Sequence, residues 1–149
     1  MMTHPLHRRL AAAFVLLVAG LADAGAENDS LDPADAAAIR QVIESQIAAF
    51  ARDDGEEAFS YASPGIRELF GTVENFMAMV RGGYQAVYRP REVRFQDTVP
   101  LPGGHAAQRL VVVGPDGRVV VAFYRMERQS DGSWRIGGVQ LLPLPERAT

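Results

Sequence analysis

Residues 106–128 read AAQRLVVVGPDGRVVVAFYRMER. Two valine-rich runs flank Gly114-Pro115-Asp116-Gly117, and a short Pro/Asp/Gly segment between two β-prone runs is typical of a hairpin turn. We therefore predict a strand on each side of this turn. Because Leu110 to Val113 and Val119 to Phe123 are apolar without interruption, we expect both faces of these central strands to be buried.

One further strand is predicted on each side of this hairpin. Residues 91–99 alternate between apolar and polar side chains, as expected for a strand with one face in water. The apolar side chains of that strand are Val93, Phe95 and Val99. Ser130-Asp131-Gly132 is a turn signal, and residues 133–142 form the last strand. Together these segments predict a four-stranded antiparallel meander.

The half of the chain before the strands has helical signals instead. Asp32 followed by Pro33 is a favourable helix start, because the Asp32 side chain can accept from free backbone N–H groups and proline needs no hydrogen bond at the first position. Ser63-Pro64 and Thr72 are further helix starts, and the last helix is expected to end at Gly82-Gly83 through backbone angles open to glycine. We predict an α+β fold, with N-terminal helices packed on a curved sheet.

The first 26 residues are typical of a secretory signal peptide. Arg8 and Arg9 precede an apolar run at residues 10–21, and small residues follow, with cleavage expected after Ala24 or Ala26. The apolar run of about 12 residues is well short of the roughly 20 that span a bilayer. We therefore predict an exported, periplasmic protein that keeps no membrane anchor after cleavage.

The chain has 149 residues, of which 48% are hydrophobic and 22% charged, and this composition favours one globular domain. We predict a cleaved segment at 1–26, a lead-in at 27–35, a single α+β domain at 36–142 and a loose tail at 143–149. Cysteine and lysine are absent from the sequence, which excludes disulfide bonds, thiol chemistry and a Schiff-base lysine.

Charge divides the predicted mature chain into two halves. Residues 27–80 contain 3 arginines and 11 acidic residues, whereas residues 81–149 contain 10 arginines and 6 acidic residues. The net charge of the mature chain is therefore about −4, which disfavours general nucleic-acid binding. Two explanations of the asymmetry remain: acidic helices beside a basic sheet, or a site on the sheet for a small anion.

Several tyrosines and arginines are candidate binding residues. Tyrosine supplies an apolar body with a polar tip, and arginine supplies a planar fork for carboxylate or phosphate. A pocket for a small anionic or apolar ligand between helices and sheet would be lined by Tyr84, Tyr88, Arg89, Arg109, Tyr124 and Arg125. Tyr84 to Arg89 are expected to be extended before Pro90. The alternative is that Arg109 and Arg125 pair with carboxylates of the acidic helices.

An enzymatic alternative rests on one carboxylate. Asp97 in an apolar cavity would act as a base, with a tyrosine as hydrogen-bond donor, because a dry pocket shifts the pKa values of both groups toward these tasks. The candidate donors are Tyr61, Tyr84, Tyr88 and Tyr124. His105 follows Pro102-Gly103-Gly104 and is expected to be a solvated turn residue. It is the one histidine of the predicted mature chain, and one histidine without acidic or cysteine neighbours at ligand spacing cannot build a zinc site. We predict no metal and no cofactor.

Longer motifs point to a family. A long first helix, shorter helices and a meander ending in Asp131-Gly132-Ser133-Trp134-Arg135-Ile136 resemble the nuclear transport factor 2-like, cystatin-like cone. IRQVIESQIAAFARDDGEEAFSYASPGIRELFG, FMAMVRGGYQAVYRP and ERQSDGSWRI, within residues 36–142, resemble an exported bacterial family called domain of unknown function 4864. Its most specific motif here is Tyr84 to Pro90. The resemblance implies a fold. It assigns no catalytic residues to positions of this chain.

These observations favour a non-enzymatic exported domain that binds a small molecule or a partner chain. The apolar central strands further predict a homodimer that forms through the sheet, because exposed rows of valine and leucine would be unfavourable in water. The second hypothesis is a cone-fold lyase, isomerase or hydrolase that uses Asp97 and a tyrosine.

Overall fold

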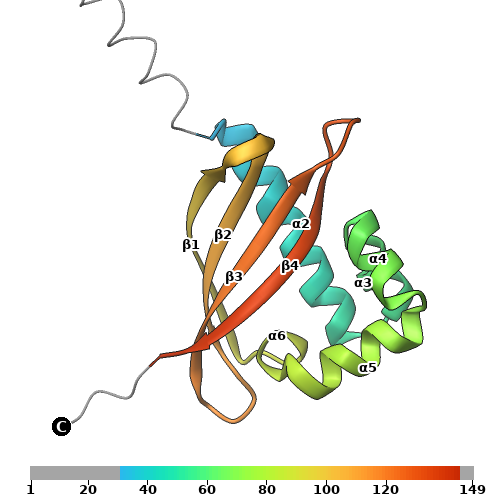
Figure 1. Ribbon diagram of the computed structural model, residues 1–149. Helices are drawn as coiled ribbons and strands as arrows, with labels where there is room; N and C mark the ends of the chain where they lie inside the picture. The colour runs from blue at the N-terminus through green and yellow to red at the C-terminus, as the bar shows by residue number, and fades with distance from the viewer. Residues whose placement is uncertain (1–30, 145–149) are drawn as a thin grey trace, which may run out of the picture. The chain divides into compact units, whose positions relative to one another are not determined.

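The computed structural model describes residues 31–144. Its elements, in order, are α2 (Pro33–Ala51), α3 (Gly55–Ser60), α4 (Pro64–Phe70), α5 (Val73–Gly83), α6 (Gln85–Tyr88), β1 (Glu92–Leu101), a 3-10 turn η1 (Pro102–Gly104), β2 (His105–Val113), β3 (Val119–Arg128) and β4 (Trp134–Pro143). The strands form one antiparallel sheet in the order β1-β2-β3-β4 (Figure 1). The predicted α+β meander is confirmed. The predicted signal peptide and residues 145–149 of the tail lie outside the described residues.

The helix starts follow the capping signals. The Asp32 side chain accepts a hydrogen bond from the Ala34 N–H at 2.9 Å and so opens α2. The Ser63 hydroxyl accepts from the Ile66 N–H at 3.3 Å to open α4, and Thr72 opens α5 in the same way. These caps confirm all three predicted starts.

Helix α5 ends at Gly83, as predicted, but neither Gly82 nor Gly83 has a positive φ, and the chain leaves the helical path at Tyr84 (φ −132°, ψ 41°). The prediction for the segment after α5 was wrong. The segment expected to be extended forms the one-turn helix α6, which ends at Tyr88. Arg89 leaves the helical path because helical angles are unfavourable for a residue that precedes a proline. The family-specific motif is thus a compact corner between the last helix and the sheet.

The register of β1 corrects another expectation. Phe95 pairs with Leu110 and Thr98 pairs with Gln108, so β1 contains a bulge between these two pairs. An extra residue in one strand moves every later side chain to the opposite face. Thr98 therefore faces the core, whereas Val99, expected to do so, is 47% exposed.

The two faces of the sheet have different surroundings. The inner face, on the side of Leu110, is buried against α2 and the other helices. The outer face, on the side of Val111 and Phe123, is covered by none of the described helices, which gather on one side of the sheet in Figure 1. The expected burial of both faces is therefore not met within residues 31–144. No helix in this range is long and apolar enough to cross a membrane.

Candidate functional site

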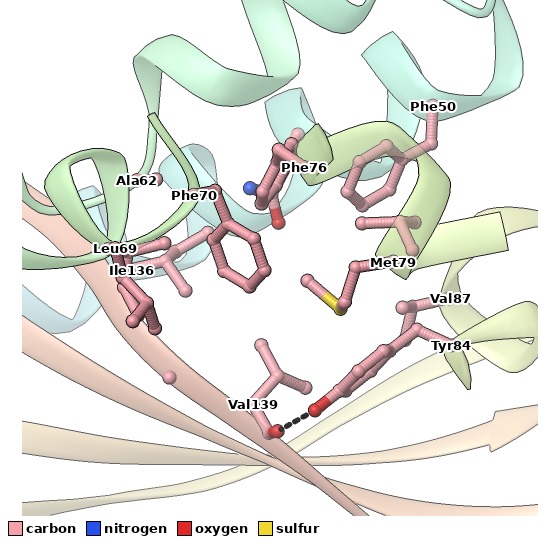
Figure 2. A pocket seen from close by; sticks show the side chains of 14 residues that line it. Phe50, Ala62, Leu69, Phe70, Phe76, Met79, Tyr84, Val87, Ile136 and Val139 are labelled. Carbon is pink, nitrogen blue, oxygen red and sulfur yellow. Dashed lines mark hydrogen bonds between the residues drawn. The ribbon is translucent and has the colours of Figure 1, made fainter. Parts of the chain in front are cut away.

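An apolar cavity of about 320 Å³ lies between the helices and strand β4. Figure 2 shows aromatic and aliphatic side chains pointing into it from several elements. They include Phe50 of α2, Leu69 and Phe70 of α4, Phe76 and Met79 of α5, Tyr84, Val87 of α6, and Ile136 and Val139 of β4. Ligand pockets in proteins start at about 300 Å³, so this cavity has room for a small ligand.

Helix α4 forms the outer wall of the cavity. None of its residues is fully buried, and Leu69 at the cavity rim is 73% exposed. At its carboxyl end the ring of Phe70 packs edge-on against Phe76, with 5.9 Å between ring centroids. At its amino end the Ser63 N–H donates to the Ile136 carbonyl of β4 at 2.8 Å. Helix α4 is therefore held at both ends, and its middle spans the cavity.

Two polar side chains belong to the cavity wall. Gln46 of α2 is buried, and its side-chain amide donates to the Ala58 carbonyl at 3.1 Å. The Tyr84 hydroxyl donates to the Val139 carbonyl at 3.1 Å, as the dashed line in Figure 2 marks. Its oxygen can still accept a hydrogen bond. Among the described residues that line the cavity, none carries a carboxylate, imidazole or guanidinium. This wall suits a neutral, mostly apolar ligand.

Tyr88 and Arg89 lie elsewhere, at the carboxyl end of α2. The Tyr88 hydroxyl donates to one carboxylate oxygen of Asp53, and Arg89 donates to the other at 2.9 Å. The Arg89 guanidinium also donates to the Phe50 carbonyl at 2.5 Å and lies over the Tyr88 ring at 4.0 Å. The Tyr88 hydrogen bond, followed by Arg89, lowers the pKa of Asp53. These residues fasten α6 to the end of α2 and do not face the cavity.

Asp53 has an unusual backbone conformation that this cluster stabilises. It is the one described non-glycine residue with positive φ, at 53°. Aspartate tolerates this left-handed conformation better than most residues, because its short side chain can form local hydrogen bonds. The contacts of Tyr88 and Arg89 hold its carboxylate in place. The most specific part of the sequence motif therefore has a structural role.

Arg109 and Arg125 both lie on the outer face of the sheet. Side chains alternate along a strand, so these arginines point away from Tyr124 and from the helices. Arg125 pairs with Glu127 of its own strand at 2.6 Å. The predicted pairing of Arg125 with helical carboxylates is wrong, and so is its place in a pocket between the layers. Among described residues, Arg109 forms no ion pair.

Tyr124 is completely buried on the inner face. Burial raises the pKa of its hydroxyl, and no described residue accepts or donates a hydrogen bond there. The structure thus distributes the six predicted binding residues over separate places. Tyr84 alone among them lines the cavity.

The residues of the enzymatic alternative are also apart. Asp97 sits in the β1 bulge, is exposed and does not line the cavity, while Tyr61 bonds to Glu57. His105 is not a solvated turn residue as expected. It begins β2 opposite Leu101, is half-buried, and its Nδ1 atom has no hydrogen-bond partner among described residues. No group of three metal-ligating side chains occurs within residues 31–144.

Sequence reasoning missed most of the cavity wall. Leu69, Phe70 and Met79 line the cavity, and none of them was among the candidate binding residues. One signal was present: Met79 is an apolar side chain beside a stripe formed by Phe76, Met77 and Val80. An apolar residue outside the buried stripe of a helix indicates that a second side of the helix has apolar surroundings. Here that second side of α5 lines the cavity.

Comparison with known proteins identifies a family and adds no activity. A family model described as "Domain of unknown function (DUF4864)" matches residues 32–149. No curated protein and no solved structure matches the chain, so the likeness to the nuclear transport factor 2-like cone stays a prediction. Because the family model covers well over half of the sequence, the chain belongs to the family Domain of unknown function (DUF4864).

Proposed function

We propose that this protein is a non-enzymatic binding protein for a small, neutral, mostly apolar molecule. The observation that carries the proposal is the cavity of about 320 Å³ behind α4, whose wall is almost entirely aromatic and aliphatic. Burial of apolar ligand surface there would supply the binding free energy. The proposal narrows the anionic or apolar ligand expected from the sequence to an apolar one, because no charged side chain lines this wall.

The size and polarity of the cavity limit the ligand. A water molecule occupies about 30 Å³ in the liquid, so the cavity corresponds to roughly ten non-hydrogen atoms. The Tyr84 oxygen offers one hydrogen-bond acceptor at the β4 side. A medium-length alkyl or aromatic alcohol or amide fits both features. Its charged counterpart would lose hydration without gaining an ionic partner.

The test is thermal unfolding of the protein with matched probes. We expect 1-octanol to raise the Tm, and octanoate at pH 8 and inorganic phosphate to have little effect. A ligand at 100 times its Kd stabilises the folded state by about 2.7 kcal/mol. No Tm increase with any neutral alkyl or aromatic alcohol would contradict the proposal.

Two tryptophan variants of α5 make the test specific. Met79→Trp places a large side chain in the cavity and should abolish the octanol effect. Ala78→Trp introduces the same side chain at an exposed neighbouring position that does not line the cavity, and it should preserve the effect. Equal responses of both variants would show that the alcohol binds elsewhere.

We also propose that the protein acts outside the cytoplasm, after removal of its first 24 or 26 residues. The support is the order of basic, apolar and small residues in that segment. Mass spectrometry of the exported protein should give an N-terminus at Gly25 or Glu27. An intact chain found in the cytoplasm would contradict this.

A further inference from the structure

The outer face of the sheet is an apolar surface that the proposed ligand site does not use. We call its valine-rich part the outer patch: Val111, Val113, Val119, Val121, Phe123 and Leu142. Val119 is 38% exposed, Phe123 36% and Leu142 43%. Monomeric proteins rarely expose large continuous apolar patches, and such patches mark interaction sites. The outer patch is continuous because its members lie on neighbouring strands β2, β3 and β4.

The dimensions of the outer face match those of a dimer interface. Four strands of nine or ten residues form the sheet. With a rise of about 3.3 Å per residue and about 4.8 Å between strands, the face measures roughly 33 by 19 Å, or about 600 Å² in projection. The accessible area exceeds the projected area because side chains protrude. It therefore approaches the roughly 800 Å² per partner of a stable interface.

The strand register makes this face complementary to a second copy of itself. Across β2 and β3 the outer residues form successive rows: Val113 with Val119, Val111 with Val121, Arg109 with Phe123, and Ala107 with Arg125. Consider a twofold axis that runs parallel to the strands, midway between the two packed sheets and between β2 and β3. It places the β2 residue of each row over the β3 residue of the same row in the partner subunit. Valine then meets valine in the first two rows.

The charged rows favour the same axis. With the axis parallel to the strands, Arg109 lies over Phe123 of the partner subunit, and Arg125 lies over the partner's Ala107. A guanidinium over an aromatic ring is favourable, and Arg109 has no ion pair among described residues. An axis perpendicular to the strands that crosses β2 at its middle residue, Arg109, would place Arg109 against the partner's Arg109. Like charges at that distance are unfavourable.

We propose that the protein is a homodimer whose outer sheet faces pack around a twofold axis parallel to the strands. Val111 contacts Val121 of the partner subunit, and Arg109 stacks on the partner's Phe123. Such an interface is isologous, so each contact occurs twice. It leaves the cavity on the helix side free, and the dimer therefore does not depend on the proposed ligand.

Light scattering of the full mature chain tests the assembly. At micromolar concentration we expect twice the monomer mass. Val121→Asp should raise the dimer dissociation constant by roughly 100-fold or more, because the partner would bury an unpaired carboxylate. Leu69→Asp is the matched control, since it changes an exposed leucine on the helix side, and it should remain dimeric. Circular dichroism confirms that both variants are folded.

Cross-linking tests the axis, and the absence of native cysteine makes single-cysteine variants possible. Packed sheets lie about 10 Å apart, beyond disulfide reach, so a short bismaleimide is the suitable reagent. Val113→Cys should cross-link to its own copy, because its row faces itself. Ser130→Cys, at the exposed β3–β4 turn, should not.

Three results would overturn the proposal. A monomeric full chain would mean that another part of the same chain covers the outer patch. A dimer that tolerates Val121→Asp would use a different surface. A dimer in which Val113→Cys fails to cross-link would have the other axis, because the two Val113 residues would then lie at opposite ends of the interface.

Discussion

The inner and outer faces of the sheet are built from adjacent residues of the same valine-rich runs, yet they have opposite surroundings. Leu110 and Val112 are completely buried. Val111 and Val113, which alternate with them along β2, are only half-buried. The difference arises from the helices, which cover one face. An uninterrupted apolar run therefore predicts a central strand, but it does not identify what covers each face.

Polar residues on the two faces differ in the same way. Gln108 is buried on the inner face, where its amide donates to the carbonyls of Gln96 at 3.0 Å and Arg109 at 2.9 Å and accepts from Thr98 at 2.5 Å. Burial demands such partners, because an unpaired buried amide is unfavourable. Arg109, the next residue, is exposed and can remain solvated in the monomer. The β1 bulge matters here, since it turns Thr98 toward Gln108.

The largest expected effect separates the two faces by a pair of adjacent substitutions. Leu110→Ala should lower the free energy of unfolding by about 2–5 kcal/mol, because it leaves a cavity in the core. Val111→Ala should lower it by less than about 1 kcal/mol in the monomer, because its side chain is already partly in water. Urea unfolding of both variants at low protein concentration measures the difference.

Val111→Ala has a second readout in this comparison. If the outer faces form the dimer, its effect on unfolding should increase with protein concentration, since folding and association are linked. Leu110→Ala should show nearly the same loss at every concentration. Equal losses for the two variants in dilute solution would contradict the distinction between the faces.

The next expected effect is a loss of stability in acid that comes from the helix side. The hydrogen bond from Arg128, followed by that from Trp134, lowers the pKa of Asp35, and the Tyr88 hydroxyl lowers that of Asp53. Carboxyl groups with lowered folded-state pKa values stabilise the fold above their unfolded pKa of about 3.9. This contribution is lost as the pH falls through the folded-state values. Unfolding should therefore become easier below about pH 3.9.

Tyr88→Phe tests the source of this acid sensitivity. Without the phenol hydroxyl, the Asp53 pKa should rise toward its ordinary value, so less stabilisation remains to be lost in acid. Relative to the parent protein, the variant should be less stable at pH 7 and nearly equal at pH 2. Tm values from pH 2 to 7 measure this. A constant Tm difference at all pH values would assign the effect of Tyr88 to packing alone.

The sequence predicted the local elements well because their signals are local. Asp32-Pro33, Ser63-Pro64 and Gly114-Pro115-Asp116-Gly117 each specify a cap or a turn through a few neighbouring atoms. The order of helices and strands then determined the fold class. The β1 bulge had no comparable signal, and it reversed the predicted direction of Val99.

The candidate site was less accessible to sequence reasoning because it depends on packing between distant segments. Tyr84 lines the cavity, whereas Tyr88 and Arg89 contact Asp53, 35 or more positions away in the sequence. Arginine and tyrosine suggest binding whether they face a ligand or a structural carboxylate. The cavity itself arises where α4 lies on β4, and no local pattern encodes that approach.

The smallest expected effect belongs to Arg125 on the outer face. The sequence had left open that Arg125 pairs with a helical carboxylate, and in that case Arg125→Met would weaken the fold markedly. The actual partner is Glu127, and the Arg125 side chain is 50% exposed, so water can replace the lost pair. Pairs of this kind contribute about 0–1 kcal/mol, and the unfolding free energy should change by no more than that. Phosphate should not alter the Tm of either protein, because Arg125 faces no pocket. A loss above about 2 kcal/mol, well outside the range for exposed pairs, would mean that Glu127 cannot be hydrated at its half-buried position. The outer face would then depend on charge pairing much as the inner face depends on helix packing.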